Sequence, residues 1–226
     1  MIAQAVRHAL RLVDVISPPG RRHVALLVAL ILFFALSPWL QTAGPSRIFY
    51  SAGFSVIILA AVLSAQGHRI LLTAAAVLAV PALLANWLDV LFPGNRALDM
   101  SANALIIAFH VAAISSLMDS ILRRDSSNID TICGALACYL LMAEAWAVSY
   151  ELIDTLQPGS LSFPDVGGVP QWTDYLYYSL TTLTTLGYGD ITPVRPFARI
   201  WATLEAATGT LYVAVAIAGI VGSFRR

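Results

Sequence analysis

The chain has 226 residues, of which 58% are hydrophobic and only 12% are charged, and its mean hydropathy is +0.77. This composition lies far from that of soluble globular proteins and predicts a membrane protein. The 13 basic residues are all Arg and balance 13 acidic residues, so the formal net charge is zero. Without a basic excess, no nucleic-acid partner is expected.

Residues 1–20 form the first predicted segment. Apolar residues recur at helical spacing up to Ile16, opposite Arg7, Arg11 and Asp14, and Pro18-Pro19-Gly20 ends the pattern. This pattern predicts an amphipathic helix that lies in the membrane interface. A disordered basic tail is the alternative.

Six apolar segments follow. A bilayer core about 30 Å thick needs roughly 20 apolar residues per helix, and each segment reaches this length, some only with their flanks. They are residues 23–41, 48–65, 69–92, 99–122, 130–155 and 194–223. The sequence therefore predicts an all-α membrane protein, with four transmembrane helices in residues 21–125 and a second domain in residues 126–226.

The arginines predict the orientation. Most of them lie on one side of the predicted helices: Arg7, Arg11, Arg21, Arg22, Arg69, Arg123, Arg124, Arg225 and Arg226. Because cytoplasmic loops carry the excess of Arg and Lys, both termini are expected in the cytoplasm of a cell whose plasma or inner membrane holds this multi-pass protein. The loop between the fifth and sixth helices is then outside.

The two cysteines lie five positions apart, at Cys133 and Cys138, inside one apolar helix. This spacing fits neither a metal site nor a disulfide, so both are read as small core residues. No cofactor is expected.

The segment between the last two apolar runs contains the most specific motif. It reads Tyr-Tyr-Ser-Leu-Thr-Thr-Leu-Thr-Thr-Leu-Gly-Tyr-Gly-Asp over residues 177–190. It resembles the pore loop of potassium channels, in which a short helix, here about Thr173 to Leu183, leads into an extended selectivity filter. The alternative is a Thr-rich hairpin with a glycine turn. The resemblance is strong over residues 130–226, whereas over residues 1–129 it is only a matching number of helices.

The filter residues would be Thr185, Leu186, Gly187, Tyr188 and Gly189. A potassium ion loses most of its hydration shell in a narrow pore, so rings of carbonyl oxygens must replace the water. Successive carbonyls point to one side only if the backbone visits conformations that a Cβ disfavours, and the two glycines remove that penalty. K⁺ is therefore expected at residues 185–188, as the permeant ion.

The motif also contains residues expected to support the filter. Tyr188 would point away from the pore, and its candidate partners are Tyr177, Tyr178, Thr181 and Thr182 on the short helix. Asp190 would accept a hydrogen bond from one of the tyrosines.

The resemblance implies further properties. One filter per chain cannot close a ring, so four copies are expected around an axis, as a homotetramer in membrane lipid that conducts K⁺ passively and is not an enzyme. Voltage-gated relatives place Arg or Lys at every third position of the fourth helix, but residues 101–118 contain neither. Steep voltage gating needs about three or four such charges per subunit, so it is not expected here. The sequence does not identify a regulatory partner.

Four residues are candidates for gating. Gly209 occupies a position where related inner helices often carry a hinge, and close packing is the alternative. Ionisable residues are costly in a membrane unless paired or hydrated, which singles out His110, Glu144 and Glu205. Glu205 would brace the filter from behind or make a purely structural hydrogen bond. His110 is either a pH sensor or a packing residue.

The leading functional prediction is a potassium-selective channel. One alternative is a non-conducting accessory or structural subunit, against which the intact Gly-Tyr-Gly-Asp argues. A transporter subunit is a second, disfavoured because such chains generally carry four loops. A poorly selective cation channel is a third, because Leu186 replaces the commoner Val.

Overall fold

The computed structural model describes residues 21–42, 46–64, 69–123, 129–163 and 169–223. Within these residues the chain is almost entirely helical. The helices are α2 (Arg22–Thr42), α3 (Ser46–Ser64), α4 (Arg69–Leu91), α5 (Arg96–Arg123), α6 (Ile129–Leu156), α7 (Trp172–Leu183) and α8 (Pro196–Ser223). Each of the six predicted membrane helices coincides with a long helix, and α7 coincides with the predicted short one. The interfacial helix predicted before residue 18 lies outside the described residues.

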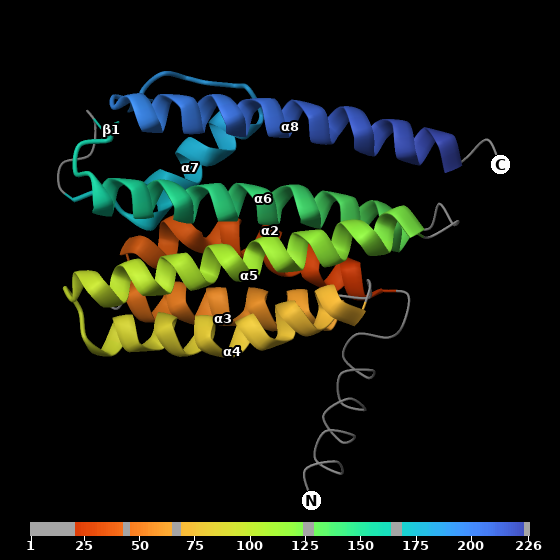
Figure 1. Ribbon diagram of the computed structural model, residues 1–226, viewed down its shortest axis with the longest axis horizontal. Coiled ribbons are helices and arrows are strands. Elements are labelled where there is room, and N and C mark those ends of the chain that lie inside the picture. Colours follow the sequence, from red (N-terminus) through yellow and green to blue (C-terminus); the bar gives the residue numbers. More distant parts are fainter. Residues whose placement is uncertain (1–20, 43–45, 65–68, 124–128, 164–168, 224–226) are drawn as a thin grey trace, which may run out of the picture.

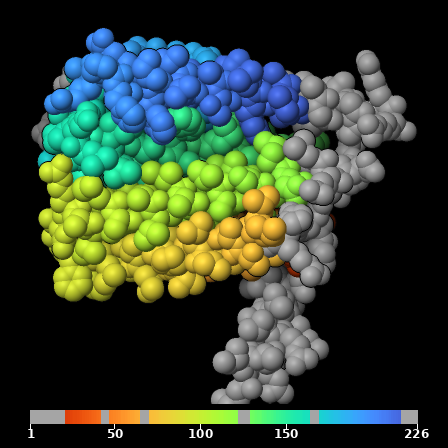
Figure 2. Space-filling view, viewed as in Figure 1, coloured from red at the N-terminus to blue at the C-terminus, as the bar shows by residue number. Residues whose placement is uncertain are grey.

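The long helices run side by side along a common direction, with α8 above α6 and the α3–α4 pair at the opposite side (Figure 1). The short α7 lies between α6 and α8, near the end where α4 joins α5. The space-filling view shows α4, α5, α6 and α8 packed into one continuous face (Figure 2). The segment predicted to form a pore loop is therefore held between the last two long helices.

Five of the described helices, α2 to α6, are long and apolar enough to cross a membrane. Large apolar side chains such as Ile31, Val77 and Leu84 are exposed on their outer faces, as expected where lipid replaces water. The all-α, multi-pass membrane architecture agrees with the prediction. Helix α8 has 28 residues and is about 42 Å long at 1.5 Å per residue; its side chains beyond residue 216 lie outside the described part, and its crossing stays a prediction.

An aromatic cluster joins the four-helix part to α7. The ring of Trp172, the first residue of α7, lies 5.0 Å from that of Phe33 in α2 and 5.2 Å from that of Phe54 in α3. Thr173 also donates a hydrogen bond of 2.6 Å to Gln41 at the end of α2. The start of α7 is thus anchored on α2 and α3 of the same chain.

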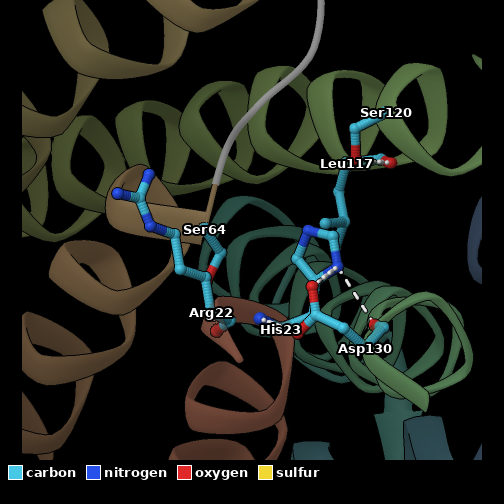
Figure 3. A network of polar contacts seen from close by, with 6 residues as sticks. All are labelled: Arg22, His23, Ser64, Leu117, Ser120 and Asp130. Carbon is cyan, nitrogen blue, oxygen red and sulfur yellow. Dashed lines mark hydrogen bonds and ion pairs between the residues drawn. The ribbon is translucent and has the colours of Figure 1, made fainter. Parts of the chain in front are cut away.

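A polar network ties the helix ends together at the opposite end of the bundle (Figure 3). The backbone N–H of His23 donates to Asp130 Oδ1 at 3.0 Å, and His23 Nδ1 lies 3.1 Å from the Asp130 carbonyl oxygen. Ser64 donates to the Arg22 carbonyl at 2.9 Å. Asp130 lies at the N-termini of both α2 and α6. Its negative charge is therefore stabilised by the positive ends of two helix dipoles. The starts of these helices are fixed to each other and to the end of α3.

A two-residue antiparallel pairing closes the other end. Strand β1 (Leu161–Ser162) follows α6, and β2 (Thr192–Pro193) follows the filter segment, with Leu161 opposite Pro193. The N–H of Val194 donates to the Ser160 carbonyl at 2.8 Å. The segments on both sides of the pore loop are thereby held together.

Candidate functional site

Helix α7 starts where its sequence provides a cap. The Asp174 carboxylate accepts a hydrogen bond of 2.7 Å from the Gln171 backbone N–H, the geometry of half a capping box. Asp174 also lies in the first turn, where a negative charge stabilises the helix dipole. The helix therefore begins within one residue of the predicted start, and the predicted end at Leu183 is also observed.

The backbone turns tightly after α7. The N–H of Thr185 donates to the Thr182 carbonyl at 2.9 Å, and the N–H of Gly187 donates to the Thr181 carbonyl at 3.0 Å. The Tyr139 hydroxyl of α6 donates to the Leu183 carbonyl at 3.1 Å. These contacts satisfy carbonyls that the helix end would leave without partners. They fix the direction in which the chain leaves the helix.

The backbone of the predicted filter alternates between two conformations. Thr185, Gly187 and Gly189 have φ values of 59°, 53° and 81°, and the residues between them do not have positive φ. This alternation is the departure from an ordinary strand that the glycines predicted. It allows successive carbonyls to face one side. A Cβ added at Gly187 or Gly189 would contact no atom within 4 Å in the single chain. Within one chain, the glycines are therefore needed for the positive φ and not for close packing.

Thr185 is the unexpected member of this set. A positive φ is rare for a β-branched residue and costs of order 1–3 kcal/mol. Such strain persists only where the surroundings impose it, and the hydrogen bonds from the N–H groups of Thr185 and Gly187 to the end of α7 do so here. Sequence reasoning missed this strain because only the glycines signal positive φ.

The structure brings two of the predicted support residues to the filter. The rings of Tyr177 and Tyr188 are parallel within 6°, with centroids 6.4 Å apart, and the Tyr177 hydroxyl donates to Asp190 Oδ2 at 2.7 Å. Tyr178 instead faces α6, where its ring lies 4.8 Å from that of Tyr150. The side chains of adjacent helix residues point about 100° apart, so the two tyrosines contact different neighbours.

Among the other two support candidates, Thr181 contacts the filter through its backbone. Its carbonyl accepts the Gly187 N–H, while its hydroxyl donates to the Tyr178 carbonyl at 3.0 Å. Thr182 is half-buried, and its carbonyl accepts the Thr185 N–H. Both threonines therefore hold the turn rather than the Tyr188 ring, and their part in supporting the filter stays a prediction.

The Tyr177 hydrogen bond lowers the pKa of Asp190 below its ordinary value of 3.8. A carboxylate with a lowered pKa stabilises the folded state at pH values above its ordinary pKa, and that contribution disappears as the pH falls through the lowered value. We therefore expect the predicted ion selectivity to be unchanged between pH 7 and pH 5 and to weaken only in stronger acid.

Flux into liposomes at external pH 3 to 7 measures this dependence. In Tyr177→Phe the hydrogen bond is lost, so the pH at which selectivity weakens should rise toward the ordinary value. The same pH profile in both proteins would contradict the assigned contact.

Glu205 of α8 makes hydrogen bonds to α6 and α7, and whether it also supports the filter stays a prediction. It is fully buried, and its two oxygens contact Ser179 Oγ and the Tyr150 hydroxyl, both at 2.5 Å. Ser179 Oγ also lies 2.8 Å from the Ala143 carbonyl oxygen. One side chain of α8 thus joins α6 and α7 midway along α7. Ser179 and Tyr150 gave no signal in the sequence, because only their tertiary partner makes them notable.

Gly209 lies where α8 crosses the end of α7. A Cβ built on it would stand 2.1 Å from the Leu183 carbonyl oxygen, far inside contact distance. The close-packing alternative therefore accounts for this glycine in the observed conformation. The hinge role stays a prediction.

His110 of α5 and Glu144 of α6 face each other. His110 Nε2 lies 3.1 Å from Glu144 Oε2, and His110 Nδ1 lies 2.8 Å from the Ile106 carbonyl oxygen. Both side chains are fully buried. The sequence indicated that each residue would be costly inside a membrane without a partner. It did not indicate that the two residues are partners of each other.

The comparisons agree with this geometry. Residues 134–226 match the family model described as "Ion channel". The match begins inside α6 and covers α7, the filter segment and α8. The C-terminal segment is therefore similar to ion channels over these residues. Helices α2 to α5 lie outside the match.

The curated relatives that the chain matches are potassium channels. The inward rectifier potassium channel Kirbac3.1 of Paramagnetospirillum magnetotacticum is 34% identical over 92 residues, which cover 39% of this chain and 28% of that protein. The two pore potassium channel c of Oryza sativa subsp. japonica is 40% identical over 48 residues, covering 21% of this chain and 10% of that protein. The mouse potassium voltage-gated channel subfamily A member 10 is 39% identical over 51 residues, covering 23% and 10%.

The chain thus spans less than a third of the length of these relatives. No solved structure gives a significant match to it. The similarity concerns the C-terminal part of the chain, and it supports the predicted resemblance to potassium channels there.

Proposed function

We propose that this protein is the subunit of a potassium-selective channel that conducts K⁺ passively. The observation that carries the proposal is the alternating backbone at Thr185, Gly187 and Gly189, placed directly after a short helix between two long ones. Carbonyls of residues 185–188 would coordinate the ion. The Thr185 hydroxyl would add an oxygen at the inner mouth.

The channel would be a homotetramer. A single filter strand cannot surround an ion, and a ring of four supplies the missing oxygens. The surface around the filter fits this assembly, because Leu186, Tyr188 and Phe197 are 55%, 68% and 54% exposed in the single chain. Exposed apolar and aromatic side chains in the filter segment and at the start of α8 are suited to contact neighbouring subunits.

In this proposal α7 is a re-entrant pore helix and α8 is the sixth membrane helix. Residues 126–226 would form the pore domain, residues 21–125 a four-helix membrane domain and residues 1–20 an interfacial segment. Both termini would be cytoplasmic in the plasma or inner membrane. Helix α5 would not sense voltage, since residues 101–118 carry no Arg or Lys.

Potassium flux through purified protein in liposomes tests the proposal. We expect flux that favours K⁺ over Na⁺ and that is lost in Gly187→Asp, because this change puts a strained side chain and a charge into the filter. Gly159→Ala is the matched control, because Gly159 also has a positive φ, of 77°, but lies outside the filter. Its flux should remain.

The other outcomes identify the alternatives. Flux without selectivity would favour a poorly selective cation channel. No flux from a verified tetramer, over a range of pH and voltage, would favour a non-conducting subunit.

A further inference from the structure

A cavity of about 770 Å³ lies apart from the filter, at the same end of the bundle. Its lining comes from the start of α3, the end of α4, the start of α5, the end of α6 and residues 169–172 before and at the start of α7. Sites for small organic molecules commonly have volumes of 300–1,000 Å³. The cavity has the size of a ligand site, and its wall includes the anchored start of α7.

Most of the ionisable side chains that line the cavity are acidic. Asp89, Asp99 and Glu151 contribute three carboxyl groups, against one guanidinium from Arg47. The Arg47–Asp89 contact is long, at 3.9 Å, and the Arg47 side chain is 55% exposed, so it offsets little of this charge. Asp89, near the end of α4, and Asp99, near the start of α5, both line the cavity. Carboxylates that line one cavity repel each other unless a proton or a cation lies between them.

Two polar atoms of the lining residues have no partner. Asp89 Oδ1 and Trp172 Nε1 are both buried without a hydrogen bond, and Trp172 is only 8% exposed. Unpaired buried polar atoms are rare in folded proteins and cost about 1–3 kcal/mol each. A ligand in the cavity would provide Asp89 with the donor that it lacks.

The rest of the lining is apolar or aromatic. It includes Ile48, Phe54, Ile106, Val148 and Tyr175. No group of three or more His, Cys, Asp or Glu among the described residues is arranged to hold a metal ion. A compact metal ion therefore suits this cavity less well than a cation with an apolar body.

We propose that this cavity binds a small organic ammonium compound, whose charged nitrogen lies against Asp89 and Asp99 and whose apolar part lies along Phe54 and Ile106. The occupant touches helices of the four-helix part together with the first residue of α7. It is therefore placed to change how firmly α7 is held. The proposal concerns binding and does not depend on ion conduction.

The test uses phenethylammonium and its neutral analogue 2-phenylethanol. Both are titrated into the purified full chain in dodecyl maltoside micelles, and binding is followed by saturation-transfer NMR. We expect phenethylammonium to bind at least tenfold more tightly. The neutral compound controls for partition into detergent, because it has the same ring. Equal binding of the two compounds would overturn the proposal.

Variants locate the site. The double variant Asp89→Asn/Asp99→Asn should weaken phenethylammonium binding at least tenfold, and Asn103→Trp should abolish it by filling the cavity. Asp119→Asn, at the other end of α5, is the control and should bind as the wild type does. Unchanged binding in both cavity variants would place the ligand elsewhere and refute the assignment.

A further titration distinguishes the two sources of an ammonium group. If the natural ligand is a lipid headgroup, phosphatidylethanolamine added to the micelles should displace phenethylammonium, whereas phosphatidylglycerol should not. If it is a free amine, neither lipid displaces the probe.

Discussion

Replacing Gly209 by alanine should destabilise the protein and impair conduction. The new Cβ would lie 2.1 Å from the Leu183 carbonyl oxygen and 3.0 Å from Leu183 Cδ1. The oxygen belongs to the backbone at the end of α7 and also accepts the Tyr139 hydrogen bond, so it cannot move without moving the turn into the filter. Overpacking of this kind typically lowers the free energy of unfolding by about 1–3 kcal/mol. We expect a loss near the upper end of this range.

The melting temperature of the purified protein, followed by tryptophan fluorescence, measures the loss, and K⁺ flux in liposomes measures the consequence. Thr210→Ala is the control, because Thr210 is exposed on the same helix and alanine favours the helix. A Gly209→Ala protein with unchanged melting temperature but altered opening would contradict the contact and favour the hinge.

The sequence was informative wherever a local pattern carries the structure. Apolar runs of membrane length placed the long helices, and the Thr and Gly pattern placed α7 and the turn into the filter. A hydrogen bond from one of the motif's tyrosines to Asp190 was also predicted, and Tyr177 is the tyrosine that donates it. These features depend on neighbours within about a dozen positions.

The contacts between distant segments could not be predicted in the same way. His110 and Glu144 are 34 positions apart, and His23 and Asp130 are 107 apart. Which residues of parallel helices meet depends on the rotation of each helix about its axis, and an all-apolar helix gives little signal of that rotation. The cavity is lined by residues from five separate segments, so no single sequence motif predicts it.

Substitutions in the buried pair of His110 and Glu144 should have the second large effect on stability. The carbonyl of Ile106 can only accept, so His110 Nδ1 donates to it and carries a proton. A further proton must then lie between His110 Nε2 and Glu144 Oε2, which are 3.1 Å apart. The pair joins α5 to α6 through a shared proton, and both residues are fully buried.

Replacing one member of the pair should therefore lower the free energy of unfolding far more than replacing both. His110→Leu leaves the Glu144 carboxyl buried without its partner, and breaking a buried pair in this way costs about 3–5 kcal/mol. Replacing both residues with Leu removes the polar groups together, so the double variant should recover most of the lost stability. Thermal unfolding of the wild type, both single variants and the double variant gives the coupling energy as a cycle. A double variant no more stable than His110→Leu would mean that the two side chains do not depend on each other, and the link between the four-helix part and the pore domain would have to lie in the apolar packing of α5 against α6.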